Sequence, residues 1–240
     1  MDSLLTIDLG LTSWADAYAL QQRIETARKA GAIGDVFLLC EHPHVITLGR
    51  NANRVNLLAS EHVLRQKNVE LQPTNRGGDV TYHGPGQIVG YPIVDLTQIK
   101  RDVGWYVRTL EETMIRASAD FGVETFRVPG KTGIWASARS TEEKLGAVGV
   151  HISRWVTSHG FAYNVSTDLR YFDLIIPCGI ADRKATSLEK LLQRNVRLAE
   201  VQPRLIQHLA ELLSREPRQV TRAELLIQLA EIEAANSVEK

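Results

Sequence analysis

Four short segments rich in apolar and β-branched residues follow one another in the second half of the chain, with no helical pattern between them. They cover residues 123–128, 133–138, 145–152 and 160–165. Turn-forming or polar residues separate them. Successive strands that lack intervening helices form antiparallel or mixed sheets rather than doubly wound parallel ones. The sequence therefore predicts an α+β or mixed α/β fold.

Two helices are predicted ahead of this strand-rich region. The first begins after the capping-box residues Ser13 and Asp16 and ends near Gly31. The second spans residues 103–121, places its apolar side chains on one face and ends at Gly122. Short apolar runs, which are typical of buried strands, lie between these helices at residues 36–40 and 45–48.

The C-terminal part of the chain changes to helical patterns. Helices are predicted at residues 203–213 and 223–232, and Thr221 is a suitable N-cap for the second. No tract rich in proline, serine and glycine interrupts residues 1 to about 195. We therefore expect one main domain over residues 1–215 and a C-terminal helical extension over residues 216–240.

Charge and cysteine usage limit the classes of partner and compartment. The 240 residues carry 28 Lys and Arg against 28 Asp and Glu, so neither nucleic acid nor an anionic membrane is a predicted partner. The longest stretch without these charges covers 15 positions, whereas a membrane-spanning helix needs about 20 apolar residues. Two cysteines and an acidic N-terminus argue against secretion. We expect a cytoplasmic monomer.

Residues 76–87 have the most unusual composition in the chain. They contain four glycines, one proline and two side chains, Arg76 and His83, that can donate hydrogen bonds. Glycine-rich loops let backbone N–H groups approach carbonyl or phosphate oxygens. Neither a Walker loop nor a dinucleotide-binding glycine motif is present. Composition alone leaves a ligand-binding loop and a pair of tight turns as equal alternatives.

Cys178 lies between Pro177 and Gly179 in an otherwise apolar segment. A lone cysteine in such a segment is usually a small buried side chain, but this bend leaves room for a carbonyl beside the sulfur. A thiol nucleophile also needs a nearby cation, which the spacing does not identify. Lys144, followed by apolar residues and glycines, is either a solvated surface charge or an amine beside a cleft.

Cys40, His42 and His44 alternate along one segment and are therefore candidate metal ligands. Pro43 interrupts the segment, and no companion pair of ligands follows at zinc-finger spacing. We expect no metal site and a packing role for Cys40.

Taken together, these segments resemble the lipoyl(octanoyl) transferase family, and the resemblance extends from about residue 5 to residue 215. Its motifs occur in order along the chain: Glu41-His42-Pro43, Thr47-Leu48-Gly49-Arg50, residues 76–87, Tyr91-Pro92, Gly130-Lys131, Gly133-Ile134, residues 144–149, residues 159–164, Pro177-Cys178-Gly179 and Thr186-Ser187-Leu188-Glu189. The resemblance implies a biotin/lipoate protein ligase-like fold, in which helices flank a mixed β-sheet.

The resemblance also implies the site residues. Cys178 corresponds to the nucleophile, and Lys144 to the lysine that lowers the pKa of its thiol. The residues that correspond to substrate contacts are Arg76, Gly77, Gly78, Asp79, Val80, Thr81, Tyr82, His83, Ala147, Val148, Gly149, Gly160, Phe161 and Ala162. His83 either assists proton transfer or holds the loop.

The implied activity of residues 1–215 is that of an octanoyl-[acyl-carrier-protein]:protein N-octanoyltransferase, the first step of endogenous protein lipoylation. The octanoyl group would pass from acyl carrier protein, through a cysteine thioester, to a lysine of a lipoyl domain, without a cofactor. The expected acceptors are the lipoyl domains of 2-oxoacid dehydrogenase complexes and the glycine cleavage H protein. Three alternatives remain open: an ATP-dependent lipoate or biotin ligase, a non-catalytic acyl-carrier-binding module, and a cysteine hydrolase with His83 or His159 as base.

Two further expectations concern the rim and the width of the site. Because carrier proteins and lipoyl domains are acidic, we expect a basic rim near Arg50, Arg54 or Arg76. Leu145-Gly146 stands where the family usually has a bulkier pair, of Ile-Ala type, and this difference is expected to bear on the width of the acyl pocket.

Overall fold

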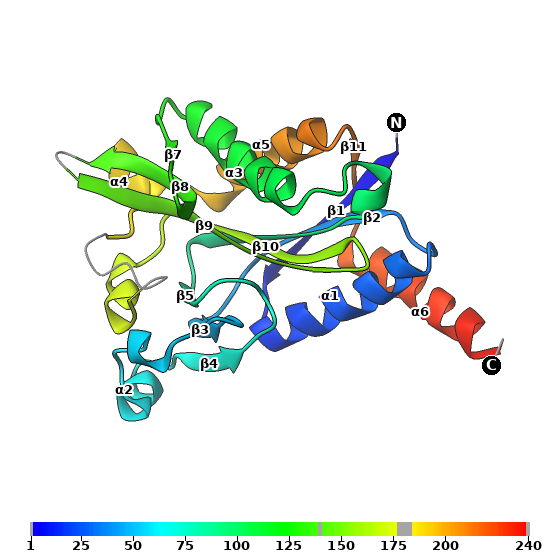
Figure 1. Ribbon diagram of the computed structural model, residues 1–240, viewed down its shortest axis with the longest axis horizontal. Helices are drawn as coiled ribbons and strands as arrows, with labels where there is room; N and C mark the ends of the chain where they lie inside the picture. The colour runs from blue at the N-terminus through cyan, green and yellow to red at the C-terminus, as the bar shows by residue number, and fades with distance from the viewer. Residues whose placement is uncertain (1, 139–140, 177–183, 239–240) are drawn as a thin grey trace.

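The computed structural model describes residues 2–138, 141–176 and 184–238 (Figure 1). Its helices are α1 (Trp14–Lys29), α2 (Glu61–Gln66), α3 (Val103–Ala119), α4 (Leu188–Leu192), α5 (Leu198–Leu212) and α6 (Arg222–Val238), with short 3-10 turns η1 (Arg54–Asn56), η2 (Leu96–Gln98) and η3 (Leu169–Leu174). Its strands are β1 (Ser3–Leu11), β2 (Asp35–Glu41), β3 (Val45–Leu48), β4 (Glu70–Pro73), β5 (Val80–His83), β6 (Gln87–Ile93), β7 (Phe126–Val128), β8 (Lys131–Ala138), β9 (Thr141–Ser153), β10 (Val156–Asn164) and β11 (Glu216–Gln219).

Across the described residues, eight strands form one mixed sheet in the order β11-β1-β2-β6-β10-β9-β8-β7. β1 pairs in parallel with both β11 and β2. The strands from β2 through β7 along this order pair in antiparallel fashion. This arrangement confirms the predicted mixed sheet, because β8, β9 and β10 follow one another in the chain without a crossover helix.

Helices cover both faces of the sheet (Figure 1). On one face, Leu110 and Met114 of α3 and Leu205 of α5 share a buried cluster with residues of β6, β9 and β10. On the other face, Ile24 of α1 and Leu229 of α6 belong to a second cluster. No helix among the described residues combines the length and hydrophobicity that a membrane span requires.

A second, three-stranded sheet in the order β4-β3-β5 lies beside the main sheet and forms its own small core with α2 and η3. In β5 the side chains alternate between two faces, as strand geometry requires. Val80 and Tyr82 are fully buried in the small core. Thr81 and His83 point the other way and line a cavity described below.

Local signals place the long helices where the sequence predicts them. The Ser13 hydroxyl accepts a hydrogen bond from Asp16 N at 3.1 Å, and Asp102 caps α3 through Trp105 N at 2.9 Å. α5, however, starts at Leu198 rather than at Pro203, because Glu200 accepts a hydrogen bond from Arg197 N at 3.0 Å and forms a capping box one turn earlier. Pro203 therefore lies inside the helix.

The C-terminal segment contains a strand that the sequence did not predict. Residues 216–219 pair with β1, and all four are exposed, so no alternating pattern marks them as a strand. α6 begins after Thr221, whose hydroxyl accepts a hydrogen bond from Glu224 N at 3.2 Å, as predicted. Arg23 of α1 pairs with Glu233 of α6 at 2.7 Å. The domain division at residue 215 stays a prediction.

Candidate active site

Side chains from α1, the glycine-rich segment and strands β5, β6, β9 and β10 enclose a cavity with about 510 Å³ of empty space, part of it open to solvent. Three adjacent strands of the main sheet, β6, β10 and β9, each contribute lining residues. Its lining residues are Trp14, Arg76, Gly78, Thr81, His83, Val89, Tyr91, Ala147, Val148, Gly149, His159, Gly160, Phe161 and Ala162.

Ten of the residues predicted to contact substrate line this cavity: Arg76, Gly78, Thr81, His83, Ala147, Val148, Gly149, Gly160, Phe161 and Ala162. The other four lie outside its lining. Val80 and Tyr82 are in the small core, and Gly77 donates its N–H to Val150 O at 2.8 Å, which fastens the loop to β9. Asp79 accepts hydrogen bonds from Asn53 N at 2.9 Å and from the Asn56 side chain.

Arg76 holds the glycine-rich loop in shape from inside. Its side chain is buried, and its guanidinium donates to Thr47 O and Asp79 O, both at 2.8 Å, to Thr47 Oγ1 at 2.9 Å and to Gly77 O at 3.0 Å. A planar fork of donors suits several carbonyls at once. Arg76 therefore does not belong to the expected basic rim, whereas Arg50 and Arg54 are exposed.

We expect Arg76→Lys to lower the free energy of unfolding by about 2–3 kcal/mol, because an ammonium replaces the fork and leaves buried carbonyls without donors. Urea denaturation of both proteins measures this difference. Arg50→Lys, an equivalent change at an exposed position of the neighbouring loop, should shift stability by less than about 0.5 kcal/mol. Equal stability of the Arg76 variant and the wild type would contradict the structural role given to Arg76.

His83 is buried at the polar side of the cavity and is neutral. Its Nδ1 lies 2.7 Å from Gln87 Oε1. Burial lowers its pKa to about 3, and the positive charge of Arg76 and the neighbouring His42 and His159 act in the same direction. A histidine in this state offers one N–H donor and one lone pair and carries no charge at neutral pH.

His42 and Cys40 form a buried hydrogen-bonded network under the cavity. His42 Nδ1 donates to Thr12 O at 2.7 Å, so Nε2 accepts from Tyr91 Oη at 2.8 Å. Cys40 is 1% exposed, lies 3.6 Å from the same Nε2 through its Sγ, and has a pKa that burial raises. The predicted packing role of Cys40 is confirmed, and among the described residues no group of three or more His, Cys, Asp or Glu side chains is arranged to hold a metal ion.

Sequence reasoning missed four residues of the cavity as substrate contacts: Trp14, Val89, Tyr91 and His159. The sequence predicts a role for His159 only in the hydrolase alternative, as its base. It adopts a positive φ of 56° within β10, where its N–H bonds Gln21 Oε1 at 2.8 Å. Its ring stacks on Tyr18 at a centroid distance of 5.4 Å, and its Nε2 lies 2.6 Å from Asn75 Oδ1. Tyr91 and His159 belong to the family motifs given above, and this was the only feature of the sequence that could have indicated their contact with substrate. Trp14 and Val89 belong to none of these motifs.

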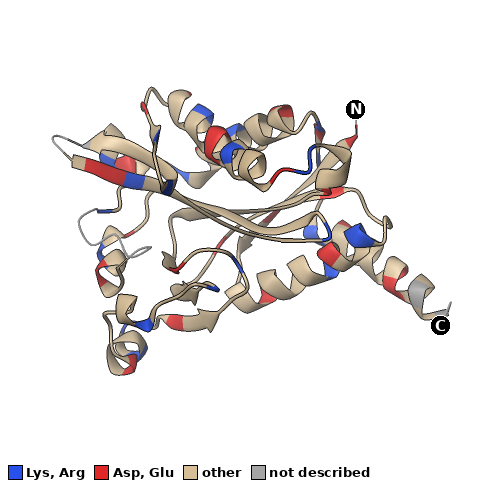
Figure 2. Ribbon diagram, in the orientation of Figure 1, with Lys and Arg blue, Asp and Glu red and all other residues tan. Residues whose placement is uncertain are grey.

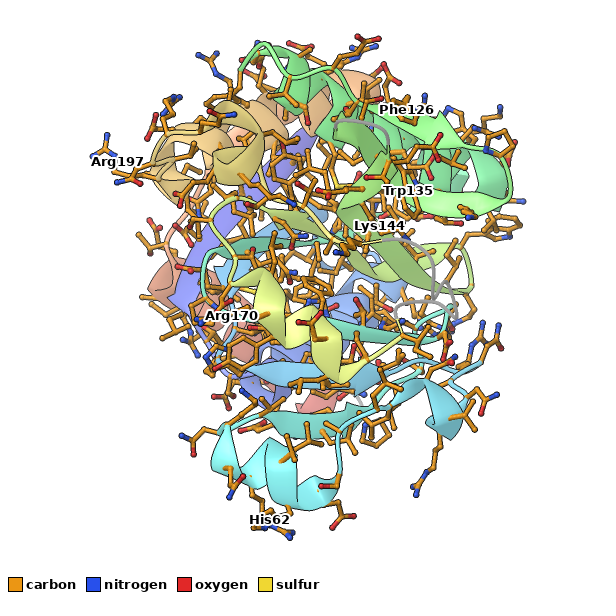
Figure 3. All side chains as sticks on the ribbon, turned by 90° about the vertical axis from the view of Figure 1, so that its left-hand side faces the viewer. His62, Phe126, Trp135, Lys144, Arg170 and Arg197 are labelled. Carbon is orange, nitrogen blue, oxygen red and sulfur yellow. The ribbon has the colours of Figure 1, made fainter. Side chains whose placement is uncertain are left out.

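Lys144 lies on β9, three residues before the cavity wall at Ala147, which corresponds to about 10 Å along a strand. Its Nζ donates to Thr132 O at 3.0 Å and lies 4.8 Å from the ring centroid of Trp135, its partner across the β8–β9 pair (Figure 3). Lys144 does not line the cavity. Cys178 lies outside the described residues.

Residues 184–186 are hydrogen-bonded to β9 at Lys144. The N–H of Lys144 donates to Lys184 O at 2.9 Å, and the N–H of Thr186 donates to Lys144 O at 2.9 Å. These two hydrogen bonds form a short parallel bridge between β9 and residues 184–186. Position 184 is six residues after Cys178 in the sequence.

The unusual pair Leu145-Gly146 does not bear on the width of this cavity. Leu145 is fully buried in the main core beside α3. A Cβ atom on Gly146 would lie 2.7 Å from Met114 Sδ, so this glycine allows α3 to approach the sheet. Both positions face the helix layer, and the expectation of an altered acyl pocket at this pair is wrong for the described cavity.

Comparison with known proteins identifies relatives over most of the chain. Residues 13–210 match the family described as lipoyl protein ligase A/B catalytic domain. A protein named octanoyltransferase from Solibacter usitatus is 51% identical over 208 residues, covering 87% of this chain and 92% of the relative. An octanoyltransferase from Acidobacterium capsulatum is 54% identical over 192 residues, covering 76% of this chain and 78% of the relative.

Solved structures show the same fold at low sequence identity. A putative lipoate protein ligase from T. acidophilum superimposes with a TM-score of 0.71 at 17% identity and covers 96% of this chain and 93% of its own. A lipoate-protein ligase A bound with ATP gives a TM-score of 0.73 at 16% identity, with coverage of 96% and 93%. The predicted biotin/lipoate protein ligase-like fold is thereby confirmed, and the chain belongs to the lipoyl protein ligase A/B catalytic domain family.

Proposed function

We propose that the chain is an octanoyltransferase, which moves an octanoyl group from acyl carrier protein to a lysine of a lipoyl domain through a thioester on Cys178. The observation that carries this proposal is the convergence of three separate sequence motifs on one cavity. Its walls are mostly apolar, with Trp14, Val89, Val148, Phe161 and Ala162 available to an alkyl chain. The names of the relatives at 51% and 54% identity support the octanoyl group as the cargo.

The proposed reaction has two balanced halves. The thiolate of Cys178 attacks the carbonyl carbon of the carrier-bound octanoyl thioester, a new carbon–sulfur bond forms, and the carrier thiol leaves. One thioester replaces another of similar energy, so no nucleotide is consumed. The amine of the acceptor lysine then attacks the acyl-enzyme, the carbon–sulfur bond breaks, and an amide leaves with the acceptor.

Lys144 would serve both halves in this scheme. As an ammonium it stabilises the Cys178 thiolate and then gives its proton to the departing carrier thiolate. As the resulting neutral amine it accepts the proton that the attacking lysine loses. Its contacts with Thr132 O and the Trp135 ring restrict the amine to one region of space.

We expect Lys144→Ala to raise the pH at which iodoacetamide modifies Cys178 by about one unit, because a neighbouring cation is removed. The second cysteine does not interfere, since Cys40 is buried. Lys131→Ala is a matched control. Lys131 Nζ also lies over the Trp135 ring, 6.0 Å from its centroid, but Lys131 has no part in the proposed pairing of Lys144 with Cys178. An unchanged alkylation profile in Lys144→Ala would remove Lys144 from its role.

The main alternative of the same fold is an ATP-dependent ligase. Ligases activate a free acid as an adenylate and need no cysteine nucleophile. The proposed acceptors are lipoyl domains of 2-oxoacid dehydrogenase complexes and the glycine cleavage H protein, and the proposed setting is a cytoplasmic monomer. The same cavity on a non-catalytic carrier-binding module would bind octanoyl carrier protein and release it unchanged.

One comparison of donors separates these functions. The protein is incubated with a lipoyl domain and either octanoyl carrier protein without nucleotide or octanoate with ATP, and the acceptor is weighed by mass spectrometry. The proposal predicts an octanoylated acceptor with the first donor only. Product formed only from octanoate and ATP would favour the ligase, release of free octanoate a hydrolase, and no reaction a binding module.

A further inference from the structure

The hydrogen-bonding polarity of the cavity follows from a chain of contacts that begins at a backbone carbonyl. Thr186 O can only accept, so Asn164 presents its Nδ2 to it at 2.9 Å. Asn164 Oδ1 therefore faces Gln87 Nε2, at 2.8 Å. Gln87 Nε2 also meets a second carbonyl, Tyr82 O, at 3.3 Å, which leaves Gln87 Oε1 for His83 Nδ1 at 2.7 Å.

Each member of this chain has its donor and acceptor ends assigned by its neighbour. Because Gln87 Oε1 can only accept, His83 carries its proton on Nδ1, and Nε2 keeps the lone pair. Nothing among the described residues hydrogen bonds to Nε2, and this atom is not one of the enclosed polar atoms such as Thr186 Oγ1. His83 thus offers the cavity an acceptor.

Three other polar side chains that line the cavity direct their hydrogen-bond donors at acceptors of the protein itself. Tyr91 Oη donates to His42 Nε2, and His159 Nε2 is paired with Asn75 Oδ1. Arg76 points its N–H groups at Thr47, Gly77 and Asp79. His83 Nε2 therefore offers a lone pair that suits an N–H donor such as an amine.

We propose that His83 Nε2 accepts a hydrogen bond from the attacking lysine amine in the second half of the reaction, and that Gln87 and Asn164 are positioning residues that lock His83 in this tautomer. The inference rests on the proposed octanoyl transfer. The amine nitrogen bonds to the acyl carbon, the carbon–sulfur bond breaks, sulfur leaves as the Cys178 thiolate, and the proton lost by the amine passes to Lys144. His83 orients the nitrogen and keeps its protonation state.

Gln87→Glu tests whether Gln87 holds His83 in this tautomer, because a carboxylate oxygen at position 87 can still accept from His83 Nδ1. The new carboxylate favours the imidazolium form of His83 against the opposing effects of burial, Arg76, His42 and His159. Once Nε2 is protonated it cannot accept. We expect transfer from the preformed octanoyl-enzyme to the lipoyl domain to fall by up to about tenfold at pH 5, with recovery at higher pH. Formation of the octanoyl-enzyme should fall by less than transfer to the lipoyl domain at the same pH.

Two further variants separate position from charge. Gln87→Met keeps the length of the side chain but removes both polar ends, so the transfer half-reaction should slow about tenfold at every pH without a new inflection. Gln66→Glu adds the same charge at the exposed end of α2, and its pH profile should match the wild type.

A measurement on the wild-type protein keeps the test independent of how the variants fold. Nitrogen-15 NMR of the histidine side chains should show His83 protonated on Nδ1 and bare on Nε2 between pH 8 and pH 5. A proton on Nε2, or a Gln87→Glu profile identical to that of Gln66→Glu, would overturn this proposal while wild-type transfer remained active. An inactive wild type given octanoyl carrier protein would instead reject the proposed function.

Discussion

Cys178→Ala is expected to reduce octanoyl transfer by at least about 10³-fold, because the variant lacks the only group in the scheme that can carry the acyl chain between the two proteins. The remaining cavity can still bind a carrier-bound octanoyl group, so KM for the donor should change little. Initial rates of lipoyl-domain octanoylation at several donor concentrations measure both parameters.

The second cysteine provides the matched control for this substitution. Cys40 is fully enclosed beside His42, and burial raises the pKa of its thiol, so it is not available as a nucleophile at neutral pH. Cys40→Ala should retain the transfer rate within a few-fold. A Cys178→Ala protein that transferred octanoyl groups at the wild-type rate would show that the acyl group moves by another route.

Stability should fall steeply in mild acid, by about 4 kcal/mol between pH 7.5 and pH 5 from His83 and His159 alone. Burial lowers the pKa of each to about 3, whereas an unfolded histidine has a pKa of about 6.5. Below pH 6.5 the unfolded chain binds protons that the folded protein does not, so acid favours unfolding. Each histidine contributes about 2 kcal/mol over this interval.

The measurement is the difference between urea unfolding free energies at the two pH values, which cancels any constant effect of a substitution. His83→Asn and His159→Asn remove one titrating group each, and asparagine tolerates the positive φ of residue 159. Each variant should lose about 2 kcal/mol of the pH dependence, and the double variant about 4 kcal/mol. A pH dependence as large as that of the wild type would show that these histidines are charged in the folded protein.

Much of the architecture could be predicted because it depends on local patterns. The cap at Ser13, the apolar face of α3 and the run of strands from β8 to β10 are all short-range signals. β11 was not predictable, since its exposed residues pair with β1 only through the backbone.

The candidate site, too, could be predicted only in part from the sequence. Arg76 and His83 stand out in the sequence by composition, and they do line the cavity. The role of Arg76 in holding the loop depends on Thr47, which lies on a different strand. The tautomer of His83 depends on contacts that join residues 83, 87, 164 and 186, and no spacing rule connects positions so distant.

The position of exposed positive charge could not be predicted from composition either. The balance of 28 basic and 28 acidic residues excluded a strongly basic chain, yet it did not predict where positive charge is available. In Figure 2 both signs occur along α1 and α3. Arg76, expected at the rim, lies inside, whereas Arg50 on the adjoining loop is exposed. Exposure depends on tertiary contacts that composition does not contain.

The most direct test of the proposed mechanism is to weigh the intact protein after incubation with octanoyl carrier protein in the absence of a lipoyl domain and of ATP. The account predicts one added octanoyl group that hydroxylamine removes, that disappears when a lipoyl domain is supplied, and that is absent from Cys178→Ala. An unmodified wild-type protein that still octanoylates the lipoyl domain, or an adduct that persists in Cys178→Ala, would contradict it.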